Sequence, residues 1–135
     1  MNPIWIPRDL ILAMHLRQLA EHGGGEGVRD EGLLDSALQR AANKLAYGEP
    51  DLCDLAAAYA FGIARNHPFI DGNKRTALVA SFTFLYVNGL AVTSTQDENV
   101  RTFLKLASGD LPEDELAVWF RTYSKPLQPH RTGGA

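Results

Sequence analysis

The chain has 135 residues, of which 45% are hydrophobic and 21% charged, so it can bury one core and is not an intrinsically disordered chain. Its net charge of −3 excludes a protein that binds nucleic acid or an anionic membrane through bulk charge. The single cysteine, Cys53, excludes an internal disulfide, and its apolar neighbours predict a buried hydrophobic side chain rather than a reactive thiol.

The first half of the chain predicts three helices. Apolar residues recur at helical spacing over residues 10–21, and the glycines that follow end this pattern. The glycine-rich segment 23–27 is predicted to be a flexible turn, and Asp30 is expected to cap a second helix. A third helix, which ends at residue 66, is apolar nearly all round and is therefore expected to be central.

The second half predicts three more helices, over residues 75–88, 97–107 and 113–123, with a short extended segment at 90–93. The tail, residues 124–135, is rich in Pro and Gly and is expected to be flexible. The pattern therefore predicts an all-α fold of about six helices.

Nothing in the chain predicts export or membrane insertion. The N-terminus lacks a cationic region followed by an apolar run, and no segment approaches the ~20 apolar residues of a membrane span. We therefore expect a cytoplasmic protein with no membrane partner and no direct nucleic-acid partner.

Residues 67–75 read H-P-F-I-D-G-N-K-R and concentrate the chemistry of the chain. The imidazole of His67 can take a proton from a hydroxyl near pH 7. The carboxylate of Asp71 can hold Mg²⁺, which typically uses one or two carboxylates together with substrate phosphates. The turn Gly72-Asn73 leads into a helix, whose first backbone N–H groups can bind an anion.

The motif ends in two adjacent cations, Lys74 and Arg75. They stand in the first turn of the predicted helix, where the helix dipole disfavours cations unless an anion sits nearby. Each motif residue alone would be a cap, a turn former or a solvated charge. Together they predict a phosphate-handling active site.

The other histidines point to no second site. His15 is predicted to be a satisfied core or boundary residue, and His22 and His130 are expected to face solvent. The chain has no His/Cys cluster with zinc spacing, no G-x-x-x-x-G-K-[ST] and no G-x-G-x-x-G.

The motif resembles the signature of the Fic/Doc family, H-x-F-x-[DE]-G-N-[GK]-R. The resemblance extends to G-V-R-D-E-G-L-L-D-S-A-L (27–38), L-A-A-A-Y-A-F-G-I-A-R-N (55–66) and F-L-Y-V-N-G (84–89). It implies a compact single Fic/Doc domain over residues 1–135, with its core in residues 8–123 and the motif loop between two central helices. The small size and Lys74 are similar to the Doc ("death on curing") branch.

The resemblance also implies a chemistry. Fic members transfer AMP from ATP to a hydroxyl of a target protein, and they have glycine where this chain has Lys74. Doc-type toxins with lysine there act as protein kinases that transfer the γ-phosphate of ATP to a threonine of elongation factor Tu and arrest translation. A Phd-like antitoxin inhibits them. We therefore favour a Doc-like protein kinase toxin, with AMP transfer to a protein hydroxyl as the alternative and a catalytically inactive partner-binding module as the second alternative.

The roles that the resemblance implies use ATP and Mg²⁺. His67 would be the general base and Asp71 the magnesium ligand. Phosphate oxygens would bind Asn73 and the backbone N–H groups from Gly72 onward, while Lys74 and Arg75 would stabilise the transferring phosphoryl group.

Two further segments matter through the resemblance. Residues 43–53 lie where relatives position their target. Residues 94–99, S-T-Q-D-E-N, match the letters of the Fic inhibitory helix. For the latter we favour a capping box between Thr95 and Glu98 over self-inhibition.

Overall fold

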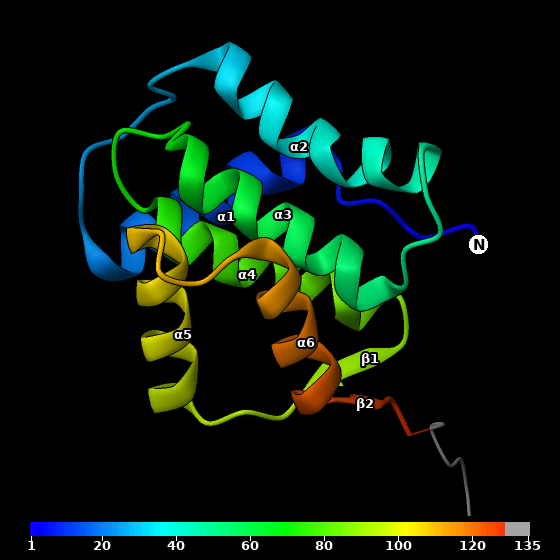
Figure 1. The fold of residues 1–135 in the computed structure, drawn as a ribbon. Coiled ribbons are helices and arrows are strands. Elements are labelled where there is room, and N and C mark those ends of the chain that lie inside the picture. The colour runs from blue at the N-terminus through cyan, green and yellow to red at the C-terminus, as the bar shows by residue number, and fades with distance from the viewer. Residues whose placement is uncertain (129–135) are drawn as a thin grey trace, which may run out of the picture.

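The computed structural model describes residues 1–128, and in this part of the chain six helices and two short strands follow one another (Figure 1). The predicted all-α fold is confirmed. His130 and most of the predicted tail lie outside the described residues. The elements are α1 (Arg8–His22), α2 (Glu31–Ala46), α3 (Leu52–Asn66), α4 (Asn73–Val87), β1 (Leu90–Val92), α5 (Gln96–Ser108), α6 (Glu113–Tyr123) and β2 (Ser124–Pro126).

Helix α3 is the centre of the fold, as its composition predicts. Ten of its residues are buried, and α2, α4, α5 and α6 all pack against it (Figure 1). Small residues let the helices approach closely, since a Cβ added at Gly62 would lie 2.9 Å from the backbone oxygen of Ala37 in α2. The core thus holds the end of α3 and the beginning of α4, between which the motif loop runs.

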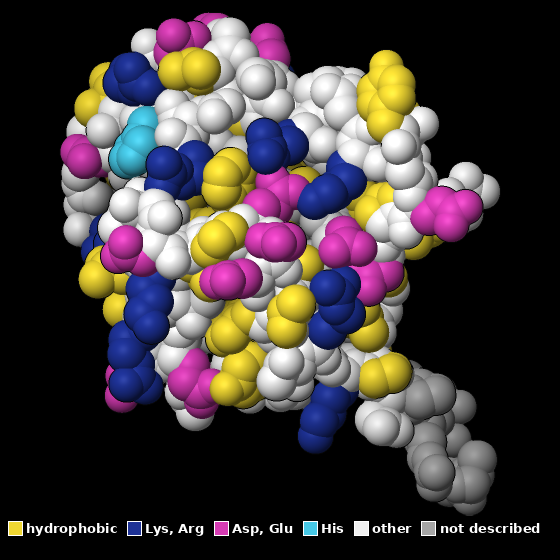
Figure 2. Space-filling view, in the orientation of Figure 1, with side chains coloured by type: hydrophobic (Ala, Val, Ile, Leu, Met, Phe, Trp, Pro, Cys, Tyr) yellow, Lys and Arg dark blue, Asp and Glu magenta, His cyan; other side chains and the backbone are white. Residues whose placement is uncertain are grey.

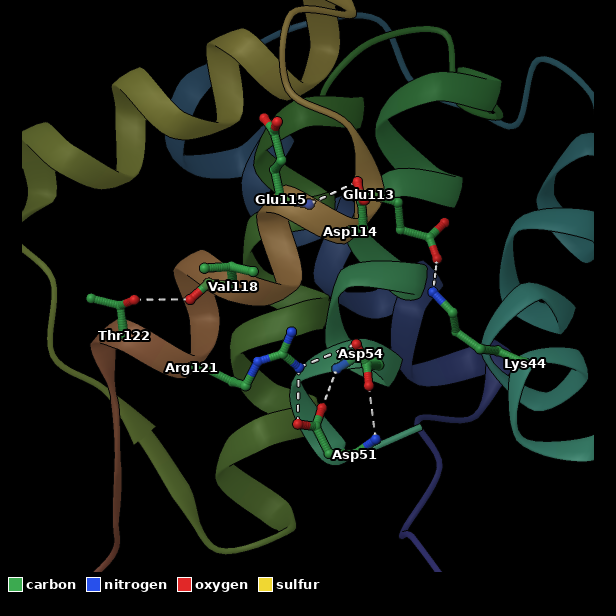
Figure 3. Close-up of polar contacts among 9 residues, drawn as sticks. All are labelled: Lys44, Asp51, Asp54, Glu113, Asp114, Glu115, Val118, Arg121 and Thr122. Atoms are coloured by element: carbon green, nitrogen blue, oxygen red, sulfur yellow. Dashed lines mark hydrogen bonds and ion pairs between the residues drawn. The ribbon is translucent and has the colours of Figure 1, made fainter. Parts of the chain in front are cut away.

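Side-chain caps and ion pairs fix where α2 and α3 begin. Asp30 accepts a hydrogen bond from the Leu33 backbone at the start of α2, as predicted. Asp51 and Asp54 form a capping box at the start of α3, and Arg121 of α6 donates to both carboxylates at 2.9 and 3.2 Å (Figure 3). The last turn of α6 is therefore fastened to the first turn of α3.

A second ion-pair cluster joins α6 to α2. The carboxylate of Glu113 accepts from Arg40 at 2.5 Å and from Lys44 (Figure 3 draws the Lys44 contact). The guanidinium of Arg40 also lies 4.6 Å from the centre of the Phe61 ring on α3. The beginning of α6 is thus tied to both α2 and α3.

The predicted tail needs a correction at its start. Ser124–Pro126 forms β2, which pairs antiparallel with β1 in the register Leu90↔Pro126 and Val92↔Ser124. Proline lacks a backbone N–H and is tolerated in this position because β2 is an edge strand. The expected extended segment after α4 is confirmed as β1, its partner in this two-stranded sheet.

Cys53 is buried near the start of α3, as predicted. Burial, with a smaller contribution from the charge of Asp51, raises the pKa of its thiol to about 11. Within residues 1–128, no helix has both the length and the apolar character needed to cross a membrane.

Candidate active site

The motif loop leaves α3 through an unusual backbone conformation. His67 follows the last residue of α3 and has φ 51° and ψ 54°, which is the left-handed region. It is the only non-glycine residue with positive φ in residues 1–128. Residues with a Cβ rarely adopt this conformation, so the loop must be held there by its surroundings.

Asn73 closes the loop from inside. Its amide oxygen accepts from the Phe69 backbone N–H at 2.9 Å, and its amide nitrogen donates to the Phe69 carbonyl at 2.9 Å. The same nitrogen lies 3.4 Å from Nδ1 of His67, at the long end for a hydrogen bond. The side chain is 7% exposed, so its amide is already bonded within the protein, and it is the Asn73 backbone N–H that stays available to a phosphate.

His15 supports the loop from α1. Its ring is 2% exposed and stacks on the ring of Phe69, with centroids 3.8 Å apart. Its Nε2 lies 2.7 Å from the backbone oxygen of Asp71, and because that oxygen only accepts, Nε2 carries the proton and donates. The prediction of a satisfied core histidine is confirmed. That His15 faces the motif loop was missed, since periodicity along α1 does not say what its buried side packs against.

The glycine-rich segment after α1 packs closely against Asp71 and Ile70, whereas its composition predicts a flexible turn. The backbone N–H of Gly25 donates to Oδ2 of Asp71 at 2.8 Å. A Cβ added at Gly24 would lie 3.0 Å from Cβ of Asp71, and at Gly25 it would lie 3.0 Å from Ile70. Only glycine lets the segment come this close.

The chain just after these glycines runs along the motif loop. Val28 and Phe69 form an isolated antiparallel bridge. Next to it, the Ile70 N–H donates to the Gly27 oxygen at 3.1 Å. The segment before α2 and the motif loop therefore form one hydrogen-bonded unit.

Helix α4 begins in a way that suits an anion. Its N-cap is Gly72, with φ 79° and no capping side chain. The first intrahelical bond is donated by the Thr76 N–H to the Gly72 oxygen, which leaves the N–H groups of residues 73–75 without such a partner. Lys74 and Arg75 form no ion pair within residues 1–128. Cations without an ion pair and free N–H groups at the positive end of a helix are features that suit a phosphate.

All six predicted site residues line one cleft of about 300 Å³. They are His67, Asp71, Gly72, Asn73, Lys74 and Arg75, and they share the cleft with Ile70 and with Ala107 of α5. On the face drawn in Figure 2, Lys and Arg side chains are interspersed with Asp and Glu side chains, so no broad basic surface covers that face. Lys74 and Arg75 are a local positive feature of the cleft, in a chain whose net charge is −3.

The cleft fits a magnesium ion better than a metal held by protein ligands alone. Residues 1–128 contain no group of three or more His, Cys, Asp or Glu side chains that could hold a metal. Asp71 is exposed, and while Oδ2 accepts from Gly25, Oδ1 has no partner within these residues. One available carboxylate oxygen beside a phosphate site is the protein contribution that Mg²⁺ commonly uses.

The segment 43–53 does not flank the cleft, contrary to the resemblance-based expectation. Helices α2 and α3 run antiparallel, since the Asn66 side chain at the end of α3 donates to the Leu33 carbonyl near the start of α2 (Figure 1). The α2–α3 connection therefore lies at the far end of α3 from His67, about 20 Å along the helix.

The capping interpretation of residues 94–99 is confirmed. The Glu98 N–H donates to the Thr95 hydroxyl at 3.2 Å, and the Thr95 N–H and hydroxyl both contact the Glu98 carboxylate. Within residues 1–128 this carboxylate forms no ion pair with Arg75. Glu98 therefore opens α5 and does not block the cleft arginine.

Comparison with known proteins shows clear sequence similarity to one family. A model of the Fic/DOC family matches residues 5–85. "Toxin Doc" of Mycolicibacterium smegmatis is 47% identical over 111 residues, which cover 78% of this chain and 85% of that protein. "Protein kinase doc" of Escherichia phage P1 is 39% identical over 87 residues, which cover 64% of this chain and 68% of that protein.

Proposed function

This chain belongs to the Fic/DOC family, and we propose that it is a Doc-type toxin that transfers the γ-phosphate of ATP to a hydroxyl side chain of a target protein. One relative carries the name of a toxin and the other that of a protein kinase. The observation that carries the proposal is the open N-terminus of α4, where Lys74 and Arg75, which form no ion pair in the described part of the chain, share one cleft with His67 and Asp71.

In the proposed reaction the residues of the chain act on both partners. His67 takes the proton of the target hydroxyl as its oxygen bonds to the γ-phosphorus, and the bond from that phosphorus to the β–γ bridging oxygen breaks to release ADP. Lys74, Arg75 and the first N–H groups of α4 hold the phosphate oxygens and neutralise their charge. Asp71 would hold Mg²⁺, which when bound neutralises charge on the phosphates.

The proposed partners follow from the same assignment. The target is a threonine of elongation factor Tu, so the outcome is arrest of translation and of growth in the cytoplasm. A Phd-like antitoxin holds the toxin inactive through a segment that folds on binding. Inhibition by a separate protein is consistent with the capping role of Glu98, whose carboxylate is bonded to Thr95 at the start of α5.

The experiment is a label-transfer assay. The purified chain is incubated with cell lysate, Mg²⁺ and ATP labelled at either the α- or the γ-phosphate. We expect label on protein only from the γ position, loss of transfer with chelator, and loss of transfer in His67→Ala. His22→Ala, at the exposed end of α1, is the control and should transfer normally.

The other outcomes have clear meanings. Label carried from the α position would show AMP transfer and refute the kinase. No transfer from either position would favour an inactive binding module. Growth arrest by His67→Ala as strong as that by the parent would refute the role of His67 as base.

A further inference from the structure

The conformation of His67 needs a support that the motif itself does not provide. Its left-handed backbone, φ 51° and ψ 54°, ends α3 at a position where glycine is the usual residue. Asn73 contacts the imidazole but not the backbone of His67. The carbonyls of Asn66 and His67 at the end of α3 are bonded instead by a residue from outside the motif.

That residue is Arg29, which precedes α2. Its Nε donates to the His67 carbonyl at 2.7 Å, and its Nη2 donates to the Asn66 carbonyl at 3.0 Å. The planar guanidinium thus spans two successive carbonyls at the point where the chain turns left-handed, which a lysine ammonium could not do in the same geometry. The cation also lies at the negative end of the α3 dipole.

Arg29 is itself fixed in place. Its backbone N–H donates to the Pro68 carbonyl at 2.7 Å, and the N–H of Asp30 donates to the same oxygen at 3.2 Å. Arg29 forms no ion pair with an acidic side chain within residues 1–128. Main chain and side chain of one residue therefore grip three successive carbonyls, those of residues 66–68.

We propose that Arg29 is a positioning residue that holds His67 in the left-handed conformation from which its imidazole reaches the cleft. The inference rests on the proposed function in one respect, which is that His67 is the base. Arg29 lies outside the cleft lining. Its loss should therefore slow the transfer step without weakening the binding of ATP.

The test compares the full-length parent with Arg29→Ala and Arg29→Lys in the label-transfer assay. We expect kcat to fall about tenfold to a hundredfold in Arg29→Ala, with the KM for ATP within about twofold of the parent, because a small misplacement of a catalytic group has this cost. Arg29→Lys should recover only part of the loss. Arg17→Ala is the matched control, since Arg17 is exposed on α1 and, among the residues that the structure describes, pairs only with Glu21.

Chemical rescue distinguishes the positioning of His67 from a general effect of Arg29 on folding. Because the Arg29 side chain contacts its carbonyls at an exposed site, added N-methylguanidine should restore a measurable share of kcat to Arg29→Ala and leave Arg17→Ala unchanged. A folded Arg29→Ala with parental kcat would overturn the proposal. Failure of rescue, with activity that returns on cooling in step with the folded fraction, would also overturn it.

The two proposals can fail independently. If label moves from the α-phosphate, the kinase is refuted, but the effect of Arg29 on the transfer rate is still measured. If no label moves, nuclear magnetic resonance of His67 provides the readout. Its amide and ring signals should shift in Arg29→Ala and return with N-methylguanidine, and unchanged signals would overturn the role of Arg29.

Discussion

Replacing Asn73 by alanine separates a structural from a phosphate-binding role for this side chain. The substitution removes both hydrogen bonds to the backbone of Phe69 and leaves a buried N–H and a buried carbonyl without partners. Each unsatisfied group costs about 1–3 kcal/mol. Because water can enter part of the vacated space, we expect the free energy of unfolding to fall by roughly 2–4 kcal/mol.

The assay is urea unfolding followed by circular dichroism, beside label transfer on the same samples. Asn88 offers a control, because its amide brackets the backbone of Ile4 with the same reciprocal pair of bonds, at 2.8 and 2.9 Å, in exposed positions, and donates one more, partly buried bond to the Phe84 carbonyl at 2.8 Å. Water can replace the two exposed bonds, so Asn88→Ala should lose only about 1–2 kcal/mol and keep full transfer.

The refuting result is specific. If Asn73→Ala unfolds within about 0.5 kcal/mol of the parent, a change that surface substitutions commonly give, and yet no longer binds ATP, then Asn73 is a phosphate ligand. The hydrogen bonds to Phe69 would then contribute little to holding the loop.

Three further substitutions or reactions test the surroundings of the loop and the core. Gly24→Ala forces a Cβ to 3.0 Å from Asp71 at φ +122° and should lower transfer about tenfold. Gly23→Ala is the control, because it brings similar backbone strain at φ +78° but its Cβ would meet nothing within 4 Å, so it should lose some stability and still transfer as the parent does. Gly62→Ala places a Cβ 2.9 Å from a backbone oxygen of α2 and should lower the free energy of unfolding, measured in urea, by about 1–3 kcal/mol. An unchanged free energy of unfolding would mean that α2 and α3 can move apart to admit the methyl group without cost. Burial raises the pKa of Cys53 to about 11, so its thiol should stay protonated near pH 8. It should react with a thiol reagent at least about tenfold more slowly in the native than in the unfolded chain. Equal reaction rates would contradict the burial of Cys53.

The helices and the motif could be predicted because their signals are local. The apolar spacing of α3 and the cap at Asp30 lie within a few residues of what they determine. The six predicted cleft residues lie within residues 67–75, so a single loop between two helices is enough to bring them together. The sequence does not show what each side chain contacts. The amide of Asn73 could bind either a phosphate or the backbone, and only the structure shows that it bonds to the backbone of Phe69.

The missed features depend on contacts between distant residues. His15 lies 56 residues from the carbonyl it bonds, and Gly25 lies 46 residues from Asp71. Helical periodicity predicts that His15 is buried but not which loop covers it. The short strand β2 was missed for the same reason, since Ser-Lys-Pro carries no strand pattern and is ordered only through its pairing with β1.

The anchoring of the N-terminal segment and of β2 has a practical consequence for handling the protein. Ile4 is bonded to Asn88 beyond the last turn of α4, and β2 pairs with β1 nearby, whereas the motif loop lies at the first turn of α4 (Figure 1). A purification tag fused to the N-terminus would therefore leave from the side of the molecule opposite the cleft. Such a tag would not shield a target from the cleft, so if the proposed activity holds, producing the unmodified chain in cells calls for a co-expressed inhibitor or the His67→Ala form.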